Sequence, residues 1–320
     1  MFFLKEFKSI SEQIELLKSR GLIINDEEKA TKYLLTNNYY NIINGYSKPF
    51  LESENNYIQG STFDEVSHLY FFDKEIKETF FKAILNIERH VKSLLAHRFE
   101  EVHRNHDMAY LDINSYDHTK SVMVSKLITK LDKIVNINKR YRNNPIQHYM
   151  DHYHKVPLWV LADYLDFGTL CHMIKVLPIS IQNKISMDLI NFIKDNNPNL
   201  EEVTFTPNEM ISFLNNIHEI RNICAHNGRL IYFKCKADTV YYPLIHEKYN
   251  IDRDDEKRNV YTAFISMECF LTKTEFAILN NTIRKRMRSL KNQICSISVD
   301  DIIGLLGFPN EWFNRPTMPQ

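Results

Sequence analysis

An uninterrupted run of helical periodicity constrains the fold of this chain more than any other sequence feature. It lies in STFDEVSHLYFFDKEIKETFFKAILNIERHVKSLLAHRFEEV, which begins at Ser61. Thr62 and Glu65 have the spacing of a capping box, in which each side chain binds the backbone N–H of the other residue. Apolar residues then recur at intervals of three and four for about 35 residues, the period of a helix face. We therefore expect one long helix here.

The composition favours an all-α fold. Of the 320 residues, 44% are hydrophobic, and only 7 are glycine and 10 proline. A large apolar fraction with few helix-breaking residues is typical of helices joined by short polar turns. A chain of this length suits one large domain or two moderate ones.

Charge and cysteine usage exclude several classes of protein. Lys plus Arg and Asp plus Glu number 40 each, so any nucleic acid must be held by a local basic patch. The five cysteines show no C-x-x-C spacing, which argues against a disulfide framework and a zinc knuckle. The sequence contains neither a long apolar run nor a leader pattern. We expect no signal peptide, no membrane span and a cytoplasmic location.

Local start and stop signals predict further elements. Amphipathic helices are expected in SISEQIELLKSRG and NDEEKATKYLLTNN, and shorter ones across 121–138 and 145–153. Residues 39–50, YYNIINGYSKPF, should form a compact turn packed by its own rings, and 103–120 a polar surface loop. KVPLWVLADYLDFGTLCHMIKVLP should be a buried helical hairpin bent at Phe167 and Gly168, with Trp159 in the core. A final helix is expected over roughly 260–292, before an ordered apolar tail.

The helix with the best-defined boundaries lies in TPNEMISFLNNIHEIRNICAHNG. Thr206 is the expected N-cap, with Pro207 at the first helical position and Glu209 closing the capping box. The pair Asn227-Gly228 is the expected stop. One face is predicted to be core because its apolar residues recur at three and four: Met210, Phe213, Leu214, Ile217, Ile220 and Cys224.

Arg221 and His226 lie five positions apart at the end of this helix. Similar spacings join Arg98 to His103 and Arg142 to His148. Of the three pairs, only Arg221 and His226 have a well-capped helix around them. Five residues on an ideal helix differ by about 140° in direction, so convergence requires a loosened last turn. A proton carrier beside a fixed guanidinium suits cleavage of RNA by its own 2′-hydroxyl, which needs a base, an acid and positive donors but no metal.

One histidine does not readily fill both proton roles at once. Two copies of the motif across a two-fold axis would supply both, so we expect a homodimer with a composite site, or a paired second motif, as the active form. A purely structural interpretation stays open, in which this is a capped helix end and Arg221 pairs with Glu219 or Glu88.

Five segments, in order along the chain, resemble the Abi-like family of bacterial abortive-infection proteins (AbiD and AbiF type) within the HEPN superfamily of helical ribonucleases and RNA-binding proteins. YYNIINGYSKPF resembles the family's N-terminal signature, and NIERHVKSLLAHRF its long helix with an acidic-basic pair. VPLWVLADYLDFGTL resembles its Trp and Phe-Gly-Thr segment. RNICAHNGRL is similar to the superfamily's Arg-polar-x-x-x-His motif, and GFPNEW to the family's closing tail.

The resemblance implies a HEPN-like helical bundle and a metal-independent endoribonuclease toxin that acts in phage defence without a cofactor. By position, Arg221 would steady the phosphate, Asn222 would support its geometry, and His226 would act as general acid or base. A cognate inhibitory RNA or protein is a further implied partner, and DNA is not expected. We divide the chain into an N-terminal helical subdomain (1–60), a HEPN-like domain (61–300) and a capping tail (301–320).

Two basic segments are candidates for RNA binding. TIRKRMRSLKNQ forms a predicted basic helix face with five cations: Arg284, Lys285, Arg286, Arg288 and Lys291. NKRYRNN surrounds an aromatic ring with cations, which suits holding a backbone and stacking a base: Lys139, Arg140, Tyr141 and Arg142. The alternatives are an ordinary solvated helix face and an ordinary loop.

A histidine-rich segment is the remaining candidate, with His148 and His152 one helical turn apart near Asp151 and His154. No further ligand lies at a recognisable spacing, so we expect no metal site. The predicted function is therefore a HEPN endoribonuclease. The alternative, from another class, is a non-catalytic RNA-binding or antitoxin-binding module in which the same residues only grip phosphate.

Overall fold

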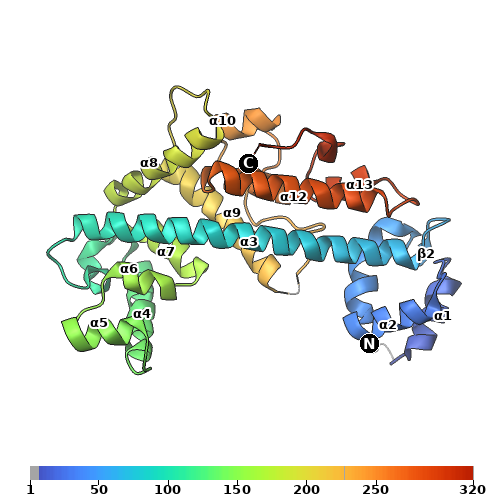
Figure 1. Ribbon diagram of the computed structural model, residues 1–320, viewed down its shortest axis with the longest axis horizontal. Helices are drawn as coiled ribbons and strands as arrows, with labels where there is room; N and C mark the ends of the chain where they lie inside the picture. Colours follow the sequence, from blue (N-terminus) through green and yellow to red (C-terminus); the bar gives the residue numbers. More distant parts are fainter. Residues whose placement is uncertain (1–6, 227, 320) are drawn as a thin grey trace. The chain divides into compact units, whose positions relative to one another are not determined.

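Helices account for 66% of the structure, a computed structural model that describes residues 7–226 and 228–319 (Figure 1). The expected all-α class is confirmed. The one sheet among the described residues pairs β1 (Leu51–Ser53) with β2 (Asn56–Tyr57) in an antiparallel hairpin, with Leu51 opposite Tyr57. No helix in this part of the chain combines the length and apolarity needed to cross a bilayer.

Two compact units share the chain, and each draws on segments far apart in the sequence. Of the described residues, unit 1 contains 7–80, 223–226, 228–233 and 279–318, and unit 2 contains 81–222, 234–278 and Pro319. The division into 1–60, 61–300 and 301–320 stays a prediction.

Unit 1 contains the expected short helices and the start of the long one. Its helices are α1 (Ile10–Ser19), α2 (Glu27–Asn37), α13 (Val299–Gly304), the beginning of α3 (Phe63–Val102) and the end of α12 (Lys273–Lys291). The predicted capping box of α3 is confirmed. The Thr62 N–H donates to the Glu65 carboxylate at 2.9 Å, and the Glu65 N–H donates to the Thr62 hydroxyl at 3.2 Å.

The aromatic segment 39–50 is helical, and it is packed by a neighbouring helix instead of by its own rings. Tyr40–Asn44 form one turn of π-helix, and Lys48–Phe50 a 3-10 turn. The buried Tyr46 ring meets Tyr70 of α3 edge to face, with ring centroids 5.5 Å apart. The expectation of self-packing was wrong because α3 supplies the apolar surface that these rings cover.

The ordered apolar tail is confirmed. After α13, the Phe308 and Trp312 rings pack edge to face with centroids 4.7 Å apart, and Trp312–Asn314 form a 3-10 turn. Trp312 and Phe313 are each only 1% exposed. The tail is therefore part of the core of unit 1.

Unit 2 confirms the helices predicted over 121–138 and 145–153. Its helices are α4 (Ser121–Asn138), α5 (Pro145–Tyr153), α6 (Leu158–Leu161), α7 (Phe167–Val176), α8 (Ile179–Asn196), α10 (Pro243–His246) and α11 (Val260–Ser266), with most of α9 (Pro207–Ala225) and the end of α3. In Figure 1, α4 to α7 gather around the C-terminal end of α3.

Two predictions in unit 2 were wrong, namely the surface loop over 103–120 and the hairpin bend at Phe167 and Gly168. Residues 103–120 are not a bare surface loop, because Tyr110 and Tyr116 are buried and donate to the carbonyl oxygens of Val156 and Tyr110 at 2.8 and 2.7 Å. The predicted hairpin bends earlier than Phe167, since the Asp166 carboxylate caps α7 by accepting from the Thr169 N–H at 2.7 Å.

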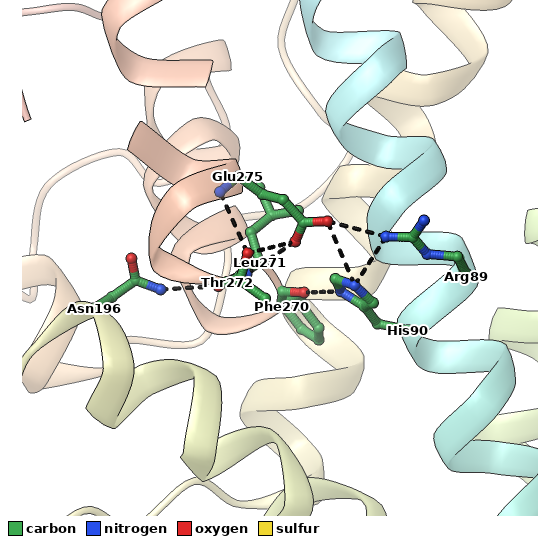
Figure 2. Close-up of polar contacts among 7 residues, drawn as sticks. All are labelled: Arg89, His90, Asn196, Phe270, Leu271, Thr272 and Glu275. Atoms are coloured by element: carbon green, nitrogen blue, oxygen red, sulfur yellow. Dashed lines mark hydrogen bonds and ion pairs between the residues drawn. The ribbon is translucent and has the colours of Figure 1, made fainter. Parts of the chain in front are cut away.

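The final helix expected over 260–292 is two helices, α11 and α12, separated by a turn (Figure 2). Thr272 and Glu275 form a capping box that starts α12, with the Thr272 N–H donating to Glu275 at 3.0 Å. Side chains from other helices satisfy the carbonyl oxygens of the turn. His90 Nδ1 of α3 donates to Phe270 at 2.9 Å, and Asn196 Nδ2 of α8 donates to Leu271 at 2.9 Å. These distant partners explain why helical periodicity alone missed the break.

Replacing Asn196 with Ala is expected to destabilise the protein by about 1–3 kcal/mol. The Asn196 amide also donates to the Glu268 carbonyl oxygen at 3.1 Å, so its loss leaves two carbonyl oxygens without their donor. Urea unfolding followed by circular dichroism measures the change. Asn183→Ala, at an exposed position of the same helix, is the control, with an expected cost below about 0.5 kcal/mol. Equal midpoints for the two variants would contradict this account of the turn.

Candidate functional site

Helix α9 has the boundaries that its capping residues predict. The Thr206 N–H donates to Glu209 at 2.7 Å, and the Glu209 N–H donates back to the Thr206 hydroxyl at 3.4 Å. The predicted core face is buried from Met210 to Ile220, and only Cys224 is half-buried. The helix ends at Ala225. Of the predicted stop, Asn227 lies outside the described residues. Gly228 leaves room for Ile223, because an added Cβ would lie 2.9 Å from the Ile223 Cδ1.

His226 occupies the turn directly after α9, in unit 1, and its side chain is exposed. An exposed imidazole at a helix end can exchange protons with a bound molecule and with solvent. The side chain has the exposure that the nuclease hypothesis requires, and its catalytic role stays a prediction.

Arg221 belongs to the part of α9 in unit 2 and is half-buried. Its guanidinium carbon lies 5.8 Å from the Phe81 ring centroid, and its Nε is buried without a hydrogen-bond partner among the described residues. The interpretation as an Arg-Glu pair is wrong. Glu219 instead accepts from the Lys236 N–H at 3.1 Å, and Glu88 pairs with Lys92 at 2.8 Å. No ion pair of Arg221 is found in the described part of the chain, so its charge is available to an anion.

Asn222 contacts a histidine that the sequence did not single out. Its Nδ2 donates to His218 Nε2 at 3.2 Å, one helical turn earlier. Burial, and then the charges of Arg221 and Lys175, lower the pKa of His218, which favours the neutral ring that accepts this bond. Gly168 packs closely here, since an added Cβ would lie 3.0 Å from His218 Nε2.

The loop that follows His226, described from Gly228 onward, is held within unit 1 by hydrogen bonds of its backbone and of the Arg229 side chain. Lys77 Nζ of α3 donates to the Gly228 carbonyl oxygen at 2.8 Å. The N–H groups of Leu230 and Ile231 donate to Asp73 Oδ1 at 3.1 and 3.2 Å. Arg229 donates to the carbonyl oxygens of Asn44 and Gly45 at 3.1 and 2.6 Å. These bonds attach residues 228–231 to α3 and to Asn44 and Gly45.

Asp73 lies at the centre of these contacts. It is 0% exposed, accepts from the Tyr46 hydroxyl at 2.7 Å and lies 3.5 Å from Lys77 Nζ. Burial raises the pKa of Asp73, while its hydrogen bonds and Lys77 act in the opposite direction. Sequence reasoning missed this residue. The available signal was an acidic side chain on the apolar face of α3, one turn after Leu69 and next to Phe72.

The basic segment after α4 is fully available to a ligand, since Lys139, Arg140, Tyr141 and Arg142 are all exposed, Tyr141 to 63%. The basic face of α12 is smaller than expected. Lys285, Arg288 and Lys291 are exposed, whereas Arg286 pairs with Glu75 at 3.0 Å. Arg284 does not belong to it, because this residue is only 2% exposed and donates to the Pro316 carbonyl oxygen at 2.5 Å. The tail carbonyl oxygens take the place of water around this guanidinium.

The histidine-rich segment of α5 does not form a metal cluster. The His148 and His152 rings are 4.3 Å apart, and His152 Nδ1 donates to the His148 carbonyl oxygen at 2.9 Å. No group of three or more metal-ligating side chains is present in residues 7–226 and 228–319. Trp159 is not core, as it is 56% exposed and lines a pocket of about 870 Å³ in unit 2. The other residues of the short helix α6 are buried, and Trp159 lies on the side of this helix that faces solvent.

The candidate site lies within a part of the chain that matches a known protein family. The model of the family described as Abi-like protein matches residues 32–232, which run from α2 to the loop held by Asp73. No curated protein and no solved structure matches.

Proposed function

The chain belongs to the Abi-like protein family, and from this premise we propose that it is a HEPN-type RNA endonuclease that acts in the cytoplasm. The family points to abortive infection, a form of phage defence. The proposed reaction is metal-independent cleavage of RNA by its own 2′-hydroxyl.

The observation that carries the proposal is the exposed His226 directly after α9, close in the chain to residues 228–231, which Lys77 and the buried Asp73 hold. A general acid or base has to meet its substrate from a fixed position. A guanidinium without an ion pair lies five residues earlier on the same helix, at Arg221. Such a group is suited to the negative charge that grows on phosphate oxygens during cleavage.

Each residue has a defined role in the proposed reaction. His226 takes the proton of the 2′-hydroxyl while the 2′-oxygen bonds to phosphorus and the bond from phosphorus to the 5′-oxygen breaks. The products are a 2′,3′-cyclic phosphate and a 5′-hydroxyl, whose oxygen receives a proton from a second imidazole. Arg221 donates to the non-bridging oxygens, and Asn222 supports this geometry. We assign the second imidazole to His226 of another copy, in a homodimer.

The chemistry of the product ends tests this proposal. The purified protein is incubated with RNA in the presence of EDTA, and with the same RNA carrying 2′-deoxy nucleotides at the mapped cleavage positions. Fragments ending in 2′,3′-cyclic phosphate are expected from the first substrate, and no cleavage is expected at the deoxy positions. Cleavage of the deoxy RNA, or products with a 3′-hydroxyl, would refute the mechanism. A cognate RNA that inhibits the protein would reduce the yield of the cyclic-phosphate fragments when it is added to the reaction.

The exposed basic segment predicts how RNA affinity responds to salt. Each phosphate contact on a single strand contributes about 0.7 to the slope of log K against log salt. Replacing Lys139, Arg140 and Arg142 with Gln should therefore reduce this slope by about 2. Fluorescence anisotropy with a labelled RNA at several salt concentrations measures it. Gln at Lys126, Lys133 and Lys194, three exposed lysines of unit 2, is the charge-matched control. A slope unchanged in the first variant would show that this segment does not hold RNA.

A further inference from the structure

A pocket of about 440 Å³ in unit 1 opens beside the loop that follows His226. Gly228 and Arg229 of this loop line it together with the π-helical turn Tyr40–Asn44 and Lys77 of α3. Its volume lies in the range of pockets that bind small ligands. Because three peptide units span at most about 11 Å, the backbone of Arg229 is close to that of His226.

The charge of the lining favours an anion. Arg229 and Lys77 are its two cations, and no carboxylate is among the described residues that line it. Arg229 is held by two backbone carbonyl oxygens, and no ion pair neutralises it within the described residues. Lys77 has the buried Asp73 at 3.5 Å as a partial counter-charge. A fixed guanidinium beside an ammonium is an arrangement that recognises phosphate.

The remaining lining groups suit a nucleobase. Tyr40 is 69% exposed, so its ring is free to stack on a planar group. Tyr232 is 39% exposed, but the Lys48 ammonium lies 4.6 Å from its ring centroid and covers one face of the ring. The amide side chains of Asn41 and Asn44 are exposed at the same pocket. Aromatic rings that stack on bases and amides that bond to base edges are the usual means of holding single-stranded RNA.

We propose that this pocket binds one nucleotide of single-stranded RNA, with its phosphate on Arg229 and Lys77 and its base against the exposed ring of Tyr40. The proposal rests on the proposed function, because it makes the pocket the subsite for a nucleotide near the scissile linkage. It adds a binding contribution from the π-helical turn, far from Arg221 and His226 in the sequence.

The test measures binding of the four nucleoside monophosphates by equilibrium dialysis, with inorganic phosphate and uridine as separate probes. Asn44→Asp places a negative charge in the pocket without changing its size, and the Asn44 backbone oxygen that holds Arg229 remains. We expect at least one nucleotide to bind about tenfold more tightly than phosphate or uridine, and Asn44→Asp to weaken it about tenfold. Asn55→Asp, an exposed turn residue of the same unit, makes the same charge change and should alter binding less than about twofold.

A second variant addresses the base. Tyr40→Ala removes an exposed ring and should weaken nucleotide binding about tenfold while leaving phosphate binding unchanged. The proposal is overturned if phosphate binds as tightly as every nucleotide, or if Asn44→Asp and Tyr40→Ala behave like Asn55→Asp. These probes contain no scissile linkage between nucleotides. Nucleotide binding without RNA cleavage would therefore refute only the nuclease, and cleavage without nucleotide binding would refute only the pocket.

Discussion

Replacing His226 with Ala lowers the rate of RNA cleavage by about 10²- to 10⁴-fold and abolishes toxicity, the loss expected when a general acid or base is removed. The fold and the affinity for RNA stay nearly unchanged, because the side chain is exposed and the cations remain. Single-turnover cleavage, thermal unfolding and fluorescence anisotropy measure the three quantities separately.

His118→Ala is the matched control, since His118 is an exposed histidine of unit 2 outside every candidate site. It should cleave like the wild type. A His226→Ala variant that cleaves at the same rate as the control would remove His226 from the mechanism. If the wild type cuts no RNA and His226→Ala lowers RNA affinity, the chain is the non-catalytic binding module that shares these residues.

Replacing Asp73 with Ala destabilises the protein by about 3–5 kcal/mol, the second large effect expected. The change leaves the N–H groups of Leu230 and Ile231 and the hydroxyl of Tyr46 without their acceptor. It also deprives Lys77 of its nearby carboxylate. Urea unfolding measures the loss. Cleavage should fall in the same variant even under conditions where it is folded, because the loop after His226 is no longer held.

Asp64→Ala is the control for Asp73, because both carboxylates lie on α3 and pair with lysine. The Asp64 pair with Lys29 is about one third exposed on each side chain, so its loss should cost less than about 1 kcal/mol. Asp73→Asn should fall between the two, since its amide oxygen still accepts from Leu230 and Ile231. Equal stability of Asp73→Ala and Asp64→Ala would show that the loop is fixed by other contacts.

Features that depend on neighbouring residues were predictable from the sequence. The capping boxes at Thr62 and Thr206 involve residues three positions apart, and both are present. The turn between α11 and α12 was missed, since its carbonyl oxygens are satisfied from α3 and α8. The burial of Arg284 was also missed because it depends on distant residues. Its position on a basic helix face suggested solvent, and only the distant tail buries it.

The candidate site likewise contains residues that a local motif reveals and residues that only the tertiary structure reveals. Arg221 and His226 stand out within one short motif, and the structure leaves the first without an ion pair among the described residues and the second exposed. Asp73, Lys77 and the π-helical turn are distant in sequence from that motif. Their contribution required tertiary contacts, which a single sequence does not specify.

The central claim is that His226 cleaves RNA during phage defence. It is tested most directly by sequencing the RNA ends that carry 2′,3′-cyclic phosphate in bacteria infected with phage while they express either the wild type or His226→Ala. The account predicts new ends in the wild-type cells that are absent with His226→Ala and present with His118→Ala. Identical end profiles in all three cultures would contradict it.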